Sequence, residues 1–206
     1  MKQTILISAF IMTTSLFFGQ KQHLEPAKDF KQYEGVLKEY YDNIFLRLYK
    51  GYSEKPIARY TSMPSFSNEY SYSVETLDGK NYVVSNKLSE SYWYSKNKNK
   101  VKLISNKTEL TNDLYLKIVA LFQLLEEQTK KPEHESMGLD GITYYFATTD
   151  KNGELKIGET WSPAEKSLLG RLVKICDNIY SLGIGNNLSQ SDILKEIEKL
   201  VIDLKH

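Results

Sequence analysis

The chain has 206 residues, and its 27 Lys and Arg against 26 Asp and Glu give a formal net charge of +1. Its single Cys excludes a disulfide framework and a cysteine-based zinc site, and the near-zero charge argues against wholesale binding to nucleic acid or anionic membranes. Hydrophobic residues make up 41%, which is too many for a disordered chain. The length fits one domain.

The first twenty residues have the pattern of a secretory signal peptide. Lys2 precedes an uncharged stretch, residues 3–20, whose apolar core is Ile5–Phe18. We predict cleavage between Gly19 and Gln20, which leaves a polar leader over residues 20–26. The alternative is an uncleaved membrane anchor, but an apolar stretch of about 14 residues is short for a span that needs about 20.

The rest of the chain, residues 27–206, is expected to form one domain. Its only Cys, Cys176, lies far from the cleavage site and therefore excludes a lipid-anchored lipoprotein. We expect an exported protein, periplasmic or extracellular, that is not stably inserted in the membrane after processing.

The chain after the leader begins with an expected amphipathic helix. Pro26 suits its first turn and Gly51 its end. The segment Ile44–Tyr49 could instead be a strand. The apolar face of the helix recurs at spacings of three and four: Phe30, Tyr33, Leu37, Tyr40, Ile44 and Leu48.

Residues 56–104 are expected to form strands. Asp78-Gly79 is a hairpin turn that pairs Tyr70–Leu77 with Lys80–Leu88. Tyr70, Tyr72 and Val74 then share a face with Val83, and Leu77, Tyr82, Val84 and Leu88 share the other. Neither face is cleanly polar, so the sheet is covered on both sides or shows aromatic rings to solvent.

The hairpin is expected to continue into two short strands. Ser91–Ser95 extends the sheet, the lysine-rich segment Lys96–Lys100 is a solvated turn, and Val101–Ile104 is the last strand. Lysines at such a place discourage pairing of a sheet edge with another strand.

The second half alternates helix and hairpin. A second hairpin has one apolar and one mostly polar face, as expected for a sheet covered on one side. Ser162, Pro163 and Glu165 form a capping sequence that starts a helix. The expected elements are a helix at 111–130, a hairpin at 142–161, a helix to about 182, a short linker and a helix at 190–204. Locally paired strands favour an α+β fold: an antiparallel sheet built from a tyrosine-rich meander and a second hairpin, packed against about four helices.

No motif for catalysis or cofactor binding is recognised in the sequence. His23, His134 and His206 do not recur at metal-ligand spacing, so we expect neither a metal site nor a cofactor. Cys176 lies on the apolar face of its helix and is expected to be a core residue.

Tyrosine is the one residue type with an unusual distribution. Ten of the fifteen Tyr fall between Tyr40 and Tyr94. Exposed aromatic rings on a rigid sheet would form a surface for a partner protein or a glycan. The alternative is that Tyr suits strands and the rings are half-buried core. The candidate binding residues are Tyr70, Tyr72, Tyr82, Tyr92, Trp93 and Tyr94.

Three functions are therefore left open, the third being a purely structural or inhibitor-like protein with no small-molecule pocket. The first is an exported, non-enzymatic domain that binds a protein or glycan through this tyrosine-rich sheet. The second is a carboxylate-based hydrolase of the cell envelope, which would need two side chains among Glu69, Glu75, Asp140 and Glu159 to converge in a pocket.

Three short segments resemble small exported bacterial proteins of unknown function. They are Met63-Pro64-Ser65-Phe66-Ser67, Asp140-Gly141-Ile142-Thr143-Tyr144-Tyr145-Phe146 and Gly158-Glu159-Thr160-Trp161-Ser162-Pro163. Together with the signal peptide, the resemblance implies export, and it implies no activity, ligand or catalytic residue.

Overall fold

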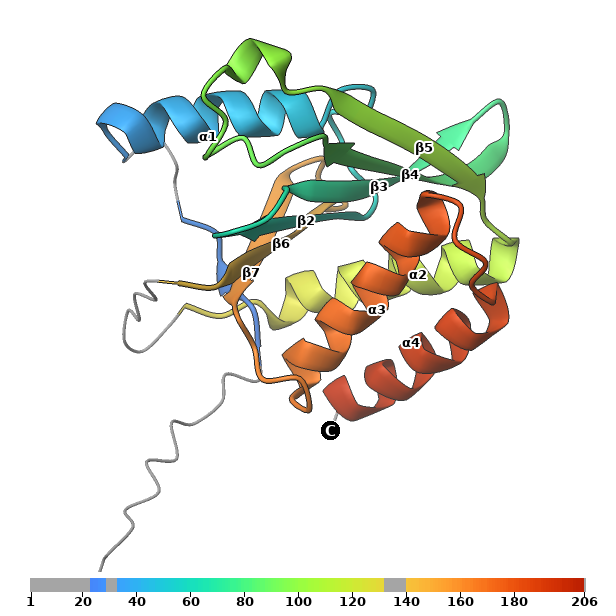
Figure 1. Ribbon diagram of the computed structural model, residues 1–206. Coiled ribbons are helices and arrows are strands. Elements are labelled where there is room, and N and C mark those ends of the chain that lie inside the picture. The colour runs from blue at the N-terminus through green and yellow to red at the C-terminus, as the bar shows by residue number, and fades with distance from the viewer. Residues whose placement is uncertain (1–22, 29–32, 132–139, 206) are drawn as a thin grey trace, which may run out of the picture.

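The computed structural model describes residues 23–28, 33–131 and 140–205, and it has an α+β fold, as predicted (Figure 1). An antiparallel sheet of seven strands has the order β1-β7-β6-β2-β3-β4-β5. The strands are β1 (Glu25–Pro26), β2 (Arg59–Pro64), β3 (Tyr70–Leu77), β4 (Lys80–Leu88), β5 (Leu103–Glu109), β6 (Ile142–Thr149) and β7 (Leu155–Trp161). The helices are α1 (Gly35–Leu48), α2 (Asn112–Gln128), α3 (Leu168–Gly183) and α4 (Gln190–Leu204), with a short 3-10 helix η2 (Lys98–Lys100).

The two predicted hairpins organise the sheet. Asp78 and Gly79 form a two-residue turn with φ of 52° and 75°, so Leu77 pairs with Lys80. Both positive φ values suit the right-handed twist of the flanking strands. Val74 lies opposite Val83, which confirms the predicted sharing of faces. In the second hairpin Thr149 pairs with Leu155.

Helices cover the sheet on both faces (Figure 1). We call the side packed against α2 and α3 the α3 face, and the side that carries α1 the α1 face. Helix α4 packs outside α2 and α3. The α3 face carries Tyr60, Tyr72, Val74, Val83 and Phe146, and the α1 face carries Met63, Leu88 and Tyr145. Strand β6 is thus buried on both faces, so the prediction of one mostly polar face was wrong, although Leu155 and Trp161 at the two ends of β7 are exposed.

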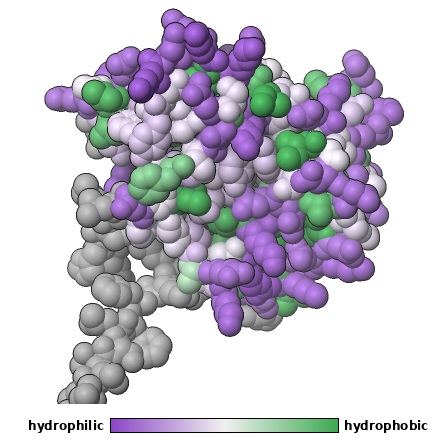
Figure 2. Space-filling view, in the orientation of Figure 1, coloured by the Kyte–Doolittle hydropathy of each residue, from purple (hydrophilic) through white to green (hydrophobic). Residues whose placement is uncertain are grey.

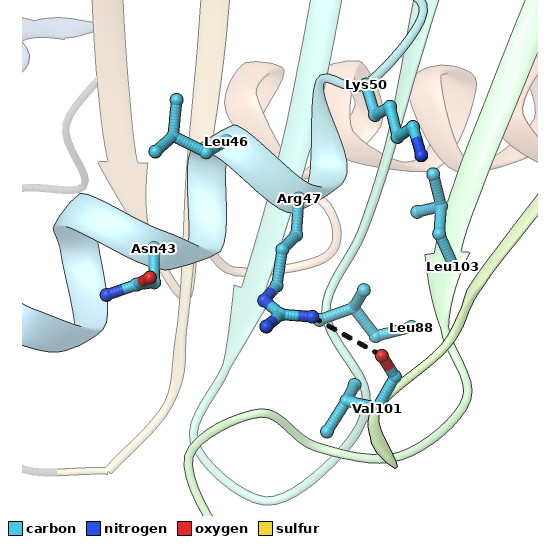
Figure 3. A pocket seen from close by; sticks show the side chains of 7 residues that line it. All are labelled: Asn43, Leu46, Arg47, Lys50, Leu88, Val101 and Leu103. Atoms are coloured by element: carbon cyan, nitrogen blue, oxygen red, sulfur yellow. Dashed lines mark hydrogen bonds between the residues drawn. The ribbon is translucent and has the colours of Figure 1, made fainter. Parts of the chain in front are cut away.

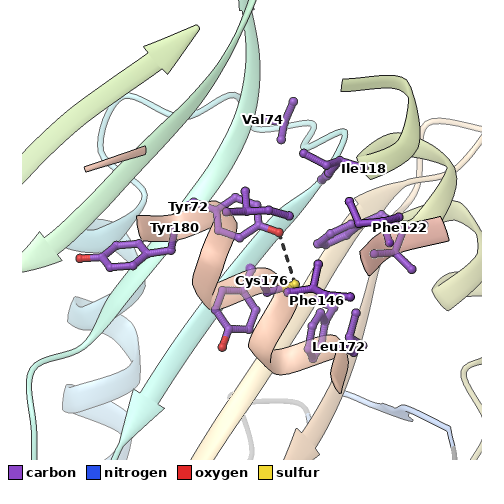
Figure 4. Packing of buried hydrophobic residues seen from close by; sticks show 14 of the residues in the cluster. Tyr72, Val74, Ile118, Phe122, Phe146, Leu172, Cys176 and Tyr180 are labelled. Carbon is purple, nitrogen blue, oxygen red and sulfur yellow. Dashed lines mark hydrogen bonds between the residues drawn. The ribbon is translucent and has the colours of Figure 1, made fainter. Parts of the chain in front are cut away.

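The core on the α3 face is apolar and aromatic (Figure 4). The rings of Phe122 and Phe146 have their centroids 6.2 Å apart, and the Tyr72 hydroxyl donates to Cys176 Sγ at 3.4 Å. Burial raises the pKa of the Cys176 thiol, so the thiol stays protonated. Each such ring removed from water stabilises the fold by about 1.5–3 kcal/mol.

The interface on the α1 face contains more hydrogen bonds. The Asn86 amide, on β4, donates to the carbonyls of Leu48 and Lys50 at 2.6 and 3.2 Å. These carbonyls lie at the end of α1, where a helix leaves acceptors unpaired. The Arg59 guanidinium lies 4.4 Å from the centroid of the Tyr49 ring. Polar side chains of the sheet therefore hold the C-terminal end of α1 in place.

Two predicted helix starts were wrong. Helix α1 begins at Gly35, whereas Pro26 belongs to β1, which pairs with β7. Helix α3 begins at Leu168 and is capped by Ser167, whose hydroxyl accepts from Gly170 N–H. Ser162 does not cap a helix, because its hydroxyl accepts from Ile142 N–H at 2.9 Å and thereby joins β7 to β6.

The segment after β4 also differs from the prediction. Residues 92–94 form a turn in place of the strand expected at Ser91–Ser95, since Ser95 N–H bonds back to the Ser91 carbonyl at 3.1 Å. The following strand, β5, runs over Leu103–Glu109 and is longer than the expected Val101–Ile104.

The described part of the predicted leader belongs to the folded domain. Leu24 is only 2% exposed, and its carbonyl accepts from Lys130 N–H at 2.9 Å. The predicted signal peptide lies outside the described residues. In the part of the chain that the structure describes, none of the helices has the length and apolar character needed to cross a membrane.

Candidate functional site

The six predicted binding residues do not share one surface. Tyr72 and Tyr92 are buried, Tyr70 and Tyr82 are partly buried, and only Trp93 and Tyr94 are exposed. Tyr70 and Tyr72 lie on the α3 face, because they alternate with residues that contact α1, and Tyr82 lies on the α1 face under Lys107. The prediction of an open tyrosine-rich sheet face was therefore wrong: helices cover both faces.

Phe66 and Tyr94 are exposed and in ring contact, and the exposed Trp93 precedes Tyr94 on the same turn; we call these three residues the aromatic platform. Their side chains are 70%, 40% and 56% exposed. The rings of Phe66 and Tyr94 stack with their centroids 6.4 Å apart and their planes within 14°. Phe66 was missed among the predicted site residues, although a lone Phe between serines in a polar turn is a recognisable signal.

The buried carboxylate of Glu69 forms hydrogen bonds with residues next to the platform. Glu69 has no exposed surface, and its oxygens accept from Tyr92 N–H and the Tyr40 hydroxyl, each at 2.9 Å. Burial, followed by the nearby charge of Glu69, raises the pKa of Tyr40, so its hydroxyl remains a donor. The Tyr40 ring packs edge-on against Trp93 at 5.2 Å between centroids. Glu69 thus fixes both the turn and the ring that supports Trp93.

A lysine holds the other side of the same turn. The Lys98 ammonium donates to the carbonyls of Tyr92 and, at 2.8 Å, Trp93. It also lies 4.9 Å from the centroid of the Tyr92 ring. Because η2 carries Lys98, the turn is bound on both sides, and little rotamer or backbone freedom is left to lose when a ligand binds.

The four carboxylates of the hydrolase alternative are not brought together. Glu75 lies on β3 and Glu69 directly precedes that strand, so six residues of extended chain separate them by about 20 Å. Glu159 lies on β7, which β6 and β2 separate from β3, and Asp140 is exposed before β6. None of the four lines either of the two best-defined cavities. The geometry therefore offers this alternative no acid–base pair.

A different carboxylate lies within the tyrosine cluster of the α3 face. Asp177 Oδ1 accepts from the hydroxyls of Tyr60 and Tyr70 at 2.9 and 2.7 Å. Burial raises the pKa of Asp177, and the two tyrosine hydrogen bonds oppose that rise. The aspartate anchors α3 to β2 and β3, and Tyr70 is partly buried because it reaches this contact.

The larger cavity, about 390 Å³, is an open hollow beside α1, and we call it the β5 hollow (Figure 3). Arg47 donates to the Val101 carbonyl at 3.4 Å, and the Lys50 side chain extends toward Leu103. Its lining residues are Asn43, Leu46, Arg47, Lys50, Leu88, Val101 and Leu103. A second cavity, of about 350 Å³, lies between α2 and β7 and is lined in part by Leu24.

On the face that Figure 2 shows, most of the surface outside these features is hydrophilic. Apolar residues reach the visible face as separate patches among hydrophilic ones (Figure 2). In the ranges 23–28, 33–131 and 140–205, no three His, Cys, Asp or Glu side chains are placed to hold a metal ion. His134 and His206 lie outside those ranges, and His23 contacts the Leu24 carbonyl.

Comparison with known proteins gives no relative from which a function could be transferred: no family model, curated protein or solved structure matches the chain.

Proposed function

We propose that this chain is an exported, non-enzymatic domain that binds a partner protein through the aromatic platform. The observation that supports the proposal is the exposure of Phe66, Trp93 and Tyr94, of which Trp93 and Tyr94 lie on a turn that hydrogen bonds to Glu69 and Lys98 hold in place. Aromatic side chains are enriched at the centres of protein interfaces, where they bury a large area at low entropic cost.

Export is proposed from the N-terminal sequence. A charged residue, an apolar stretch of secretory length and a small residue at Gly19 together form a signal for secretion. The mass of the protein recovered from the periplasm or medium tests this, because cleavage after Gly19 leaves a chain that begins at Gln20. Recovery of the uncleaved chain from the membrane fraction would contradict it.

The partner can be identified by photo-crosslinking from a residue of the platform. A photo-reactive phenylalanine analogue in place of Tyr94 keeps an aromatic ring at that position and crosslinks whatever contacts it in the producing cells. The captured protein is then identified, purified and titrated against the wild-type chain.

The decisive comparison uses two triple variants. Phe66→Ala with Trp93→Ala and Tyr94→Ala removes the platform. A matched control removes three exposed apolar side chains from other surfaces: Leu116→Ala, Leu155→Ala and Ile202→Ala. We expect the platform variant to weaken the purified complex at least a hundredfold, as loss of aromatic hot spots does, and the control to leave it within about threefold. Equal losses in both variants would contradict the proposal.

A glycan is the second candidate ligand. Phe66 and Tyr94 present exposed, near-parallel rings, and aromatic ring faces of this kind can pack against a sugar ring. Binding of the purified chain to immobilised envelope polysaccharides, lost in the platform variant and kept in the control, would favour the glycan over a protein.

A further inference from the structure

The outer edge of the sheet is formed by β5, whose backbone is paired on one side only (Figure 1). Leu110 N–H donates to the Asn81 carbonyl at 2.8 Å, so even-numbered residues of β5 direct their backbone groups toward β4. Because these directions alternate, the backbone groups of Leu103, Ser105 and Lys107 point outward. No described residue forms a hydrogen bond with those outward groups. The edge therefore offers a row of free donors and acceptors.

The β5 hollow lies next to this edge. Leu103 contributes to its floor, and its side chain lies on the α1 face together with those of Ser105 and Lys107. Residues directly opposite each other in an antiparallel pair project to the same face. A strand added along β5 would therefore direct the side chain opposite Leu103 over the hollow, whose apolar lining residues are Leu46, Leu88, Val101 and Leu103.

The charge around the edge is positive. Lys50, Lys102 and Lys107 are exposed, and the Lys107 side chain lies on the α1 face against the Tyr82 ring. Lys87, on the neighbouring strand, is also exposed and lies opposite Ile104. The acidic residue of β5 itself, Glu109, is at its far end and forms an ion pair with Lys80 at 2.9 Å.

We propose that β5 binds an extended, acidic segment of a partner protein as an eighth strand. Main-chain hydrogen bonds to Leu103, Ser105 and Lys107 supply affinity, and one apolar side chain of the segment occupies the β5 hollow. Acidic residues on either side of that anchor meet Lys50 and Lys107. In strand addition to a sheet edge, main-chain hydrogen bonds usually provide the affinity and a side-chain pocket provides the specificity.

The positive charge of the lysines favours an acidic strand over a basic one at this edge. Positive side chains along an edge repel basic strands and lower the tendency of a protein to aggregate, but an acidic strand neutralises the same charges. A second copy of this chain is disfavoured, because it would bring its own Lys102 and Lys107 to an edge that is already basic. The partner is therefore expected to be a different protein with an exposed acidic strand or tail.

Three peptide probes test the proposal against the purified full chain. The first is an eight-residue acidic peptide of alternating Glu and Thr with one central Leu, labelled with a fluorophore. The second has Lys in place of every Glu. The third is the acidic peptide with alternate backbone nitrogens methylated, which removes the donors that pair with β5. Fluorescence anisotropy measures binding at low and at physiological salt.

A single substitution isolates the edge. Ser105→Pro places a proline where the N–H points outward, so no hydrogen bond to β4 is lost while pairing with an added strand is blocked. Ser105→Ala keeps the N–H and is the matched control. The double variant Lys50→Glu with Lys107→Glu reverses the charge beside the edge and leaves the backbone unchanged. It tests the proposal if the Ser105→Pro variant does not fold.

We expect only the unmethylated acidic peptide to bind, more weakly at higher salt. Binding should weaken at least tenfold in Ser105→Pro or in the charge-reversed variant, and less than twofold in Ser105→Ala. Equal binding of the methylated peptide, equal binding to Ser105→Pro, or no binding of the acidic peptide at millimolar concentration would overturn the proposal. So would a dimer, detected by sedimentation, that Ser105→Pro abolishes, because a second copy would then be the occupant.

This proposal is independent of the aromatic platform. The platform variant retains β5, and the β5 variants retain Phe66, Trp93 and Tyr94. Failure of one set of experiments therefore leaves the other unaffected.

Discussion

The buried carboxylate of Glu69 accepts a hydrogen bond from the backbone N–H of Tyr92 at 2.9 Å. Burying a carboxylate without a cationic partner is unfavourable unless hydrogen bonds satisfy it. Here the second oxygen accepts from the Tyr40 hydroxyl. Through these two hydrogen bonds, Glu69 fixes the turn that carries Trp93 and Tyr94.

Replacing Glu69 by Gln should loosen this turn. One of the two acceptors becomes an amide donor. Either Tyr92 N–H then faces another donor and is left buried without an acceptor, or the amide donates to the Tyr40 hydroxyl oxygen and the hydroxyl hydrogen loses its acceptor. An unsatisfied buried polar group costs about 1–3 kcal/mol. Urea unfolding should show a loss of that size, and hydrogen exchange should show faster exchange at Tyr92. Glu90→Gln, an exposed neighbour, is the control; an equal loss there would contradict the role of Glu69.

Asp177 should make stability depend on pH. Burial raises its pKa in the folded state, whereas in the unfolded chain it titrates near 3.9. Below that value both states are protonated and the unfavourable burial of charge is absent. As the pH rises through the interval up to the folded pKa, the folded state binds more protons than the unfolded state, so the free energy of unfolding falls.

Replacing Asp177 by Asn should remove this dependence. The Asn side-chain carbonyl can still accept from Tyr60 and Tyr70, but it carries no charge. We expect the variant to equal the wild type at low pH and to exceed it in stability at pH 7. Asp203→Asn, an exposed residue paired with Arg171, should leave the slope unchanged. Parallel pH curves for Asp177→Asn and the wild type would contradict the assignment.

The sequence predicted the hairpins because their signals are local. The residues of a two-residue turn decide the register by themselves, and Asp78-Gly79 therefore placed Val74 opposite Val83 correctly. The predicted start of α3, at Ser162, was wrong because the hydrogen bond that the Ser162 hydroxyl forms depends on a strand distant in sequence. Ser162 has the right neighbours for a cap, but its hydroxyl bonds to Ile142 on the adjacent strand, and Ser167 performs the capping.

The candidate site was predictable only in part. Alternation along a strand tells which tyrosines share a face, and it grouped Tyr70 with Tyr72 correctly. It cannot tell how deeply a helix from elsewhere in the chain covers that face. Tyr72 is buried because α3 packs over it and places Cys176 within 3.4 Å of its hydroxyl. The exposed platform arises instead from two turns, one carrying Phe66 and the other Tyr94, that no sequence spacing relates.

Leu24 should behave as a core residue despite its place near the predicted leader. It is almost fully buried against Gly158, at the edge of the cavity between α2 and β7. Leu24→Ala should lower the free energy of unfolding by about 2–5 kcal/mol, as deletion of a buried leucine side chain does. Leu155→Ala, half exposed on β7, should change it far less. A small effect of Leu24→Ala in urea unfolding would show that this segment is dispensable to the fold.

Gly183, at the end of α3, should not tolerate even one added carbon. A Cβ at that position would lie 2.0 Å from Ser85 Oγ and 2.9 Å from Ser85 Cβ, so α3 approaches β4 too closely for a side chain. We expect Gly183→Ala to destabilise the protein by about 1–3 kcal/mol through overpacking. The Ser85 hydroxyl also donates to the Tyr180 carbonyl at 3.0 Å and cannot rotate away without losing that bond.

A double-mutant cycle separates this clash from a general effect on the helix. Ser85→Gly removes the two nearest atoms that the new Cβ would meet, with loss of the hydrogen bond to Tyr180, and leaves only the Val83 Cγ2 atom, at 3.2 Å. In that background Gly183→Ala should lose most of its destabilising effect, because the methyl group of Val83 can shift by a few tenths of an ångström and alanine is favoured over glycine in a helix. The coupling between the two substitutions, measured by urea unfolding, should therefore be of the same size as the single loss. Additive losses would mean that Gly183 is needed for a reason other than its approach to Ser85.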